Sequence, residues 1–302
     1  MPDITNEIQA LKRERDAIIL AHYYTEDAVQ ALADHVGDSY YLSKVARECP
    51  QKTLVFCGVR FMGESAKIMN PEKTVLMPDA VADCPMAHMT DAERIRQVRA
   101  QHPDAAVVCY INSTAEAKAN SDVCVTSANA MRIVQALPNR EIYFIPDENL
   151  ARHIAAKLPE KQFIYNKGYC HVHTKLTAEA LQEAKDAHPE ALVLAHPECK
   201  QEVLALADYI GSTSGIIDYA AQSKNEAFIV CTEIGVMYEL KQKNPQKRFY
   251  PVGQGQICLD MKRITPEKIK RCLETMAPQV EVDSTLRTGA LKALEAMHAM
   301  AR

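Results

Sequence analysis

Apolar runs of strand length alternate with amphipathic helical stretches along the whole chain. The six pairs are DAIILAH with EDAVQALADHV, KTLVFCG with FMGESAKIM, AAVVCYI with TAEAKANS, REIYFIP with ENLARHIAAKL, ALVLAHP with KQEVLALADYI, and AFIVCTE with GVMYELKQK. Continuous apolar runs rich in β-branched residues are typical of strands buried on both faces, and helices between them are typical of parallel sheets. The pattern predicts an α/β fold with parallel sheets covered by helices.

One frame of polar positions occurs three times, in IILAHYYTEDAVQALADHVGDS, VVCYINSTAEAKANSDVCVTS and LVLAHPECKQEVLALADYIGSTS. His22, Tyr110 and His196 end the first strand of the three segments. A hydroxyl residue follows each of them 17 residues later, and these are Ser39, Ser127 and Thr213. Repetition at a fixed period indicates three homologous units.

A cysteine lies near the end of each repeat, after a proline in NPEK, LPEK or NPQK. Cys84, Cys170 and Cys258 are 86 and 88 residues apart, which is the period of the repeat itself. Three such units are expected to pack about a pseudo-threefold axis, where equivalent residues meet. We predict three similar αβα domains over residues 1–90, 91–178 and 179–274, with a C-terminal helix within 275–302 packing back on the first.

Composition narrows the function classes. The chain has 302 residues, a formal net charge of -4 and 25% charged residues, and no cluster of Lys and Arg interleaved with aromatics, so nucleic-acid binding is not expected. The N-terminus does not resemble a signal peptide and no apolar window is long enough to span a membrane, so we expect a cytoplasmic protein. Ten cysteines in such a chain are expected to be reduced thiols, some of them serving a metal or a catalytic step.

The three repeated cysteines are candidate metal ligands. Three thiolates with no fourth equivalent ligand suit a 4Fe–4S cluster with one open iron, because structural zinc takes four protein ligands. Two other interpretations stay open: three core cysteines inherited from one ancestral unit, and a local zinc site of Cys170, His171 and His173. The other seven cysteines are interpreted as structural.

Polar residues end the first strand of each unit in pairs spaced by two, which places both side chains of a pair on one face. The pairs are His22 with Tyr24, Tyr110 with Asn112, and His196 with Glu198. Ligands of parallel α/β sheets bind beyond the carboxyl ends of the strands. Ser39, Ser127 and Thr213 start helical runs, and three helix N-termini could bind a polycarboxylate. Taken singly, these hydroxyls could equally be ordinary helix caps.

Several cofactor and nucleophile motifs are absent from the sequence. There is no G-x-G-x-x-G after a strand, no phosphate-binding G-x-x-x-x-G-K-[ST] loop, no C-x-x-x-C-x-x-C and no G-x-S-x-G. Dinucleotide, nucleoside triphosphate, radical and serine-nucleophile chemistry are therefore not indicated.

The sequence resembles the quinolinate synthase (NadA) family. The matching segments include AHYYTEDAVQALADHVGDS, FCGVRFMGES, YINSTAEAKANSDVCVTS, KGYCHVH, LAHPEC, YIGSTSGII, CTEIGVMYEL and ICLDMKRITPEKI, over roughly residues 18 to 270. The resemblance implies three αβα domains about a pseudo-threefold axis with the active site at their shared interface. It implies condensation of iminoaspartate with dihydroxyacetone phosphate to quinolinate, with loss of phosphate and water, in NAD biosynthesis. L-aspartate oxidase would be a metabolic partner.

The resemblance also assigns residues. Cys84, Cys170 and Cys258 would bind a 4Fe–4S cluster. Substrate carboxylates and phosphate would contact His22, Ser39, Tyr110, Asn112, Ser127, His196, Glu198, Ser212 and Thr213. Tyr24 and Glu198, with His22 and Tyr110, would form the catalytic set. Glu198 would act as a base most effectively with a pKa raised by partial burial, and Tyr24 would donate or relay protons.

The chain departs from the expected family pattern at a few positions, including Asp83 before the first cysteine and Asp260 after the third, and none of these removes a proposed ligand. Two alternatives in function stay open. A dehydratase acting on another hydroxy acid would use the same cluster. A metal-bearing binding protein would show no turnover.

Overall fold

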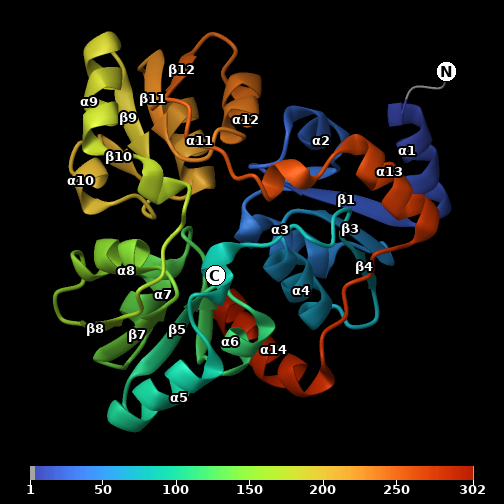
Figure 1. Cartoon of the computed structure of the whole chain (residues 1–302), viewed down its shortest axis with the longest axis horizontal. Helices are drawn as coiled ribbons and strands as arrows, with labels where there is room; N and C mark the ends of the chain where they lie inside the picture. Colours follow the sequence, from blue (N-terminus) through green and yellow to red (C-terminus); the bar gives the residue numbers. More distant parts are fainter. Residues whose placement is uncertain (1–3, 302) are drawn as a thin grey trace.

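Three parallel sheets of four strands each form the framework of the computed structural model, which describes residues 4–301. Their strand orders are β2-β1-β3-β4, β6-β5-β7-β8 and β10-β9-β11-β12, so all three sheets share one topology. Figure 1 shows them as three lobes around a common centre, blue, green, and yellow to orange. The predicted α/β class with three sheets of parallel strands is confirmed.

The three units contain the same succession of elements. The first consists of α1 (Ile4–Glu14), β1 (Ala17–His22), α2 (Asp27–Leu32), β2 (His35–Gly37), α3 (Ser39–Glu48), β3 (Thr53–Cys57), α4 (Arg60–Met69), β4 (Thr74–Leu76) and the 3₁₀ helix η1 (Pro85–His88). The second consists of α5 (Ala92–Gln101), β5 (Ala106–Tyr110), α6 (Ala115–Ala119), β6 (Val123–Val125), α7 (Ala130–Ala136), β7 (Glu141–Ile145), α8 (Glu148–Ala155), β8 (Gln162–Tyr165) and η2 (His173–Lys175).

The third unit repeats this order and is followed by two further helices. Its elements are α9 (Ala178–Ala187), β9 (Leu192–Ala195), α10 (Gln201–Leu204), β10 (Tyr209–Ile210), α11 (Thr213–Gln222), β11 (Ala227–Cys231), α12 (Val236–Lys243), β12 (Arg248–Pro251) and η3 (Met261–Arg263). The C-terminal helices are α13 (Pro266–Thr275) and α14 (Ser284–Met300). Within residues 4–301, no helix has the length and apolar character needed to cross a bilayer.

The first and third strands of each unit lie at the centre of its sheet. β1, β3, β5 and β11 are buried at every position, because helices cover both faces of the sheet. These central strands are the apolar runs visible in the sequence. The second and fourth strands are edges of two to four residues, such as Tyr209–Ile210, and the sequence pattern did not predict them. They are too short and too mixed in polarity to stand out.

The C-terminal helices connect the units. The sequence predicted that the helix of segment 275–302 packs back on the first unit. In the structure α13 packs on α1, α2 and β3 of the first unit, whereas α14 packs mainly on α6 and β6 of the second and also contacts α4 of the first. Gly289 of α14 permits this packing, because a Cβ there would lie 2.6 Å from the carbonyl oxygen of Ala119.

Candidate active site

A cavity lined by residues of all three units lies where the units meet. Its walls contain the carboxyl ends of central strands from all three sheets, as expected for parallel α/β sheets. Cys84, Cys170 and Cys258 all line it. The predicted strand-end pairs line it as well: His22, Tyr24, Tyr110, Asn112, His196 and Glu198. Residues more than 170 positions apart in the sequence therefore share one site.

Each of the three cysteines precedes a short 3₁₀ turn that follows the fourth strand of its unit. All three are free, partly buried thiols. Burial raises the pKa of Cys258 to about 11, and it raises the pKa values of Cys84 and Cys170 further.

Backbone N–H groups face each cysteine sulfur in the same pattern. The groups two and three residues further along favour the thiolate in every unit: Met86 and Ala87 for Cys84, Val172 and His173 for Cys170, and Asp260 and Met261 for Cys258. N–H groups are oriented toward all three thiols, but burial of the site opposes negative charge on the sulfurs. The thiols therefore need a cationic group beside them to become thiolates. The residues present fit an iron–sulfur cluster.

His22 and His196 adopt the same local geometry. The backbone N–H of Tyr24 donates to Nδ1 of His22 at 3.1 Å, and that of Glu198 donates to Nδ1 of His196 at 3.4 Å. Burial lowers the pKa of both rings to about 3, so both are neutral. Because Nδ1 accepts, the proton lies on Nε2, which for His196 is 3.2 Å from Oγ of Ser127. These rings are neutral donors aimed at the site.

Glu198 is the buried charge at the centre of the site, with 3% of its surface exposed. The Tyr110 hydroxyl donates to its Oε1 at 2.6 Å, and Nδ1 of His173 lies 2.8 Å from its Oε2 in an oblique approach. Burial alone would raise the pKa of this carboxyl, but His196, His173 and Tyr110 outweigh burial and hold the pKa below its usual range. The condition under which Glu198 would be most effective as a base, a raised pKa, is therefore not met, because its polar neighbours stabilise the carboxylate.

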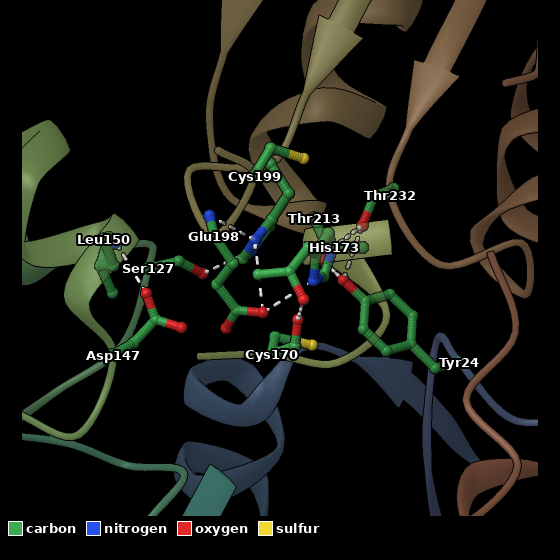
Figure 2. A network of polar contacts seen from close by, with 12 residues as sticks. Tyr24, Ser127, Asp147, Leu150, Cys170, His173, Glu198, Cys199, Thr213 and Thr232 are labelled. Atoms are coloured by element: carbon green, nitrogen blue, oxygen red, sulfur yellow. Dashed lines mark hydrogen bonds and ion pairs between the residues drawn. The ribbon is translucent and has the colours of Figure 1, made fainter. Parts of the chain in front are cut away.

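A chain of polar contacts connects Glu198 to Tyr24 (Figure 2). Nε2 of His173 is 2.9 Å from Oγ1 of Thr232, which in turn is 2.9 Å from the Tyr24 hydroxyl. The same hydroxyl lies 2.8 Å from Oγ1 of Thr213. Burial and the charge of Glu198 raise the pKa of Tyr24 well above its usual value, so Tyr24 is a neutral phenol that can donate. The chain joins side chains from all three units.

The predicted hydroxyl residues lie at or beside helix N-termini. Ser39 and Thr213 are the first residues of α3 and α11, and Ser127 lies in the turn before α7. All three line the cavity. Ser212 does not line it, because its hydroxyl accepts the N–H of Gly215 as the cap of α11. Asp38 caps α3 in the equivalent position by accepting the N–H of Tyr41 at 2.9 Å.

Several polar residues of this region were not among the predicted site residues. His173 was considered only as a zinc ligand, and Thr232, Asp147 and Glu233 were not considered. The last three directly follow the third strand of their unit, β7 or β11. The carboxyl ends of the first and third strands meet at the same edge of a parallel sheet. A search for polar residues just after the third strand of each unit could therefore have identified these three.

The structure also alters the local zinc interpretation. Cys170, His173 and Glu198 offer ligand atoms within 4.8 Å of one another. Among residues 4–301, this is the one group of three possible metal ligands that lie so close together. His171 lines the cavity but is not part of this group. Structural zinc takes four protein ligands, and the group supplies three.

Comparisons with known proteins give the family of this chain. The profile of the NadA family, described as quinolinate synthetase A protein, matches residues 6–299. The chain belongs to the NadA family. A quinolinate synthase from Clostridioides difficile (strain 630) is 52% identical over 299 residues, which cover 99% of this chain and 98% of that protein. One from Caldicellulosiruptor bescii is 49% identical over 97% of each chain.

An archaeal relative shows the same extent of similarity. Quinolinate synthase 2 from Methanosarcina acetivorans is 47% identical over 97% of this chain and 94% of its own length. Membership of the NadA family over nearly the full length confirms the predicted enzyme class, a quinolinate synthase of NAD biosynthesis. It does not by itself assign individual residues.

Proposed function

We propose that this chain condenses iminoaspartate with dihydroxyacetone phosphate to form quinolinate, releasing phosphate and water, and that Cys84, Cys170 and Cys258 hold a 4Fe–4S cluster. One observation carries the proposal. A cysteine from each repeat lines the same cavity as the polar strand ends of all three units. Three core cysteines inherited without a common role would have no reason to face a shared polar cavity.

The three cysteine sulfurs would ligate three irons of the cluster. When bound, the cluster would supply one open iron that acts as a Lewis acid toward a substrate oxygen and assists loss of water. The N–H groups that face each sulfur support thiolate ligation in all three units. Glu198 and His173 lie beside Cys170, so the polar groups and the ligand loops border the same space.

Anionic substrate groups would be held by neutral donors. Nε2–H of His22 and of His196, the amide of Asn112 and the hydroxyls of Ser39 and Ser127 line the cavity. The N-termini of α3 and α11 add free N–H groups with a favourable dipole. Neutral donors of this kind would bind the carboxylate or phosphate groups of the substrates.

Proton transfer would run through Glu198 and Tyr24. An ionised Glu198 with a lowered pKa is a weak base, and it suits the stabilisation of positive charge on an imine nitrogen or on His173. Tyr24 is a phenol that donates, and its contacts to Thr213 and Thr232 provide a path along which its proton is replaced. His173 connects the two groups, because it touches both Thr232 and Glu198.

Two further parts of the proposal come from the sequence. We infer a cytoplasmic location and a metabolic coupling to an L-aspartate oxidase, because iminoaspartate is a reactive imine that must be supplied as it is made. Rapid transfer would limit its hydrolysis.

The test is product formation under anaerobic conditions. Protein purified without oxygen is mixed with dihydroxyacetone phosphate and with iminoaspartate generated in the same vessel, and quinolinate and phosphate are quantified by chromatography. The proposal predicts equal amounts of both products. A dehydratase for another hydroxy acid predicts neither product, and a binding protein predicts full metal loading without turnover. Either result would contradict the proposal.

A further inference from the structure

Glu233, which is buried, and Lys262, which is partly exposed, form an ion pair that the proposed reaction does not use. Nζ of Lys262 is 3.0 Å from Oε1 of Glu233, and Glu233 is fully buried. Ion pairs removed from water are costly unless their remaining hydrogen bonds are satisfied. The partners of this pair therefore indicate what it does.

Glu233 binds the loop of the third cysteine. Its carboxylate accepts the backbone N–H of Cys258 at 3.1 Å and the backbone N–H of Gly235 at 2.6 Å. It follows strand β11 by two residues, so it is fixed to the central part of the third sheet. The carboxylate thus ties the proposed ligand loop to the framework of its unit.

The second unit has an equivalent residue. Asp147 follows strand β7 by two residues, as Glu233 follows β11, and is fully buried. The backbone N–H of Cys170 lies near its carboxyl group, whose Oδ1 accepts the N–H of Leu150 at 2.7 Å and whose Oδ2 makes no hydrogen bond. Val59 occupies this position in the first unit, where Asp83 accepts the N–H of Cys84 at 2.7 Å instead. A carboxyl group at each cysteine N–H argues for a common role in placing the ligand loops.

Lys262 extends the contact of the third unit to the first. Its Nζ donates to the backbone carbonyl oxygen of Tyr24 at 2.7 Å. The side chain of Gln30 also donates to the carbonyl oxygens of Tyr23 and Gly235, at 2.9 and 3.0 Å. Gly235 is in close contact with this segment, because a Cβ there would lie 2.7 Å from the carbonyl oxygen of Tyr23.

We propose that Glu233 and Lys262 are positioning residues that couple the Cys258 loop to the backbone of Tyr24, so that binding of the cluster orders the segment that carries the proton donor. The inference rests on the proposed function, since it needs the cluster at Cys258. The pair would thus link cofactor binding in the third unit to the placement of the Tyr24 side chain in the first.

Hydrogen exchange tests the coupling in the full chain. Backbone exchange of residues 20–27 is measured by mass spectrometry, without oxygen, in the cluster-loaded and cluster-free wild type. We expect loading to slow exchange in this segment about tenfold, because closed hydrogen-bonded loops exchange only on opening. In Lys262→Met this difference is lost, and in Lys262→Arg it is retained.

A matched control and a second variant separate coupling from general damage. Lys268→Met removes a partly exposed lysine of α13 that binds Asp79, and the effect of loading at residues 20–27 should remain. The double variant Glu233→Gln/Lys262→Met avoids an unpaired buried charge, and it should load iron while still losing the effect.

Two results would overturn the inference. One is the same slowing by the cluster in Lys262→Met as in the wild type. The other is no slowing in a wild type whose iron content shows full loading. A wild type that takes up no iron would instead contradict the proposed cluster itself, and the inference would fall with it. The iron assay on each sample therefore distinguishes the two failures.

Discussion

Glu198 is held as a carboxylate by its neighbours rather than by solvent. Tyr110, His173 and His196 surround it in a site that excludes water. A group of this kind stabilises developing positive charge more effectively than it removes protons from weak acids. In the proposed reaction Glu198 would therefore stabilise and orient a positively charged group, and Tyr24 is the better proton donor.

The variant Glu198→Gln tests this role. It keeps the size of the side chain and removes the charge, so we expect kcat to fall by roughly 100-fold or more, within the range for groups that stabilise charge in the transition state. The iron content should not change, because Glu198 is not a proposed ligand. Both are measured on anaerobic protein, with the exposed Glu202→Gln as a control. Loss of iron in Glu198→Gln would make this residue structural instead.

The buried histidines predict how stability depends on pH. Folding lowers the pKa of His22 and His196 from 6.5 to about 3. Between these values the unfolded chain takes up a proton at each ring and the folded chain does not. Stability therefore falls as pH drops through this window, by up to about 1.4 kcal/mol per pH unit for each histidine.

Urea unfolding of the cluster-free protein between pH 7 and about 4.5 measures this slope. His196→Asn removes one of the two titrations, so the dependence of its unfolding free energy on pH should be weaker than that of the wild type. Equal slopes in the two proteins would mean that His196 is protonated in the folded state.

The threefold repeat in the sequence identified most of the polar residues of the site. His22, Tyr110 and His196 were identified by their equivalent positions, and the structure brings them to one cavity. His173 and Thr232 were not identified, because neither has a counterpart of the same chemistry in the other units. The direction of the pKa shift of Glu198 depends on contacts across units, which a sequence pattern does not contain.

At the scale of elements, α14 is a connection between two units and not an appendage of one. Its buried face, with Ala290, Ala293 and Leu294, packs on α6 and β6. Small residues on both helices permit a close approach at Gly289. The amphipathic pattern predicted this helix, but a pattern shows which face is buried and not which neighbour covers it.

Gly289→Val tests the close approach. Its Cβ would lie 2.6 Å from the Ala119 carbonyl oxygen, and backbone cannot move aside as a flexible side chain can. The helix propensities of Gly and Val differ little, so the steric cost decides, and we expect the free energy of unfolding to fall by about 2–3 kcal/mol. Gly255→Val is the control, because no atom lies within 4 Å of a Cβ there. Equal denaturation midpoints for the two variants would contradict this packing.

How deeply each strand is buried decides how well the sequence predicts it. Central strands are buried on both faces and therefore appear as continuous apolar runs, of which AFIVC is an example. Edge strands such as His35–Gly37 are short and only partly buried, so the physical constraint on their sequence is weak. The fold class follows from the central strands, whereas the strand order and the edge strands need the structure.

At the scale of the whole molecule, the site exists only because three units face one another. The first and second units share one apolar core, into which α13 and α14 also pack. The third has separate cores on the two faces of its sheet, and Tyr23 of the first unit packs into one of them. The contacts of Gly235 with Gln30 and of Lys262 with Tyr24 thus lie where the third unit meets the first.

The central claim is that one cysteine from each unit binds a shared iron–sulfur cluster. It is tested most directly by iron and acid-labile sulfide per chain in protein purified without oxygen, for the wild type and for Cys84→Ser, Cys170→Ser and Cys258→Ser. The account predicts about four irons and four sulfides in the wild type, from the composition of a 4Fe–4S cluster, and a large loss in each variant. Full loading in any one of the three variants would contradict it.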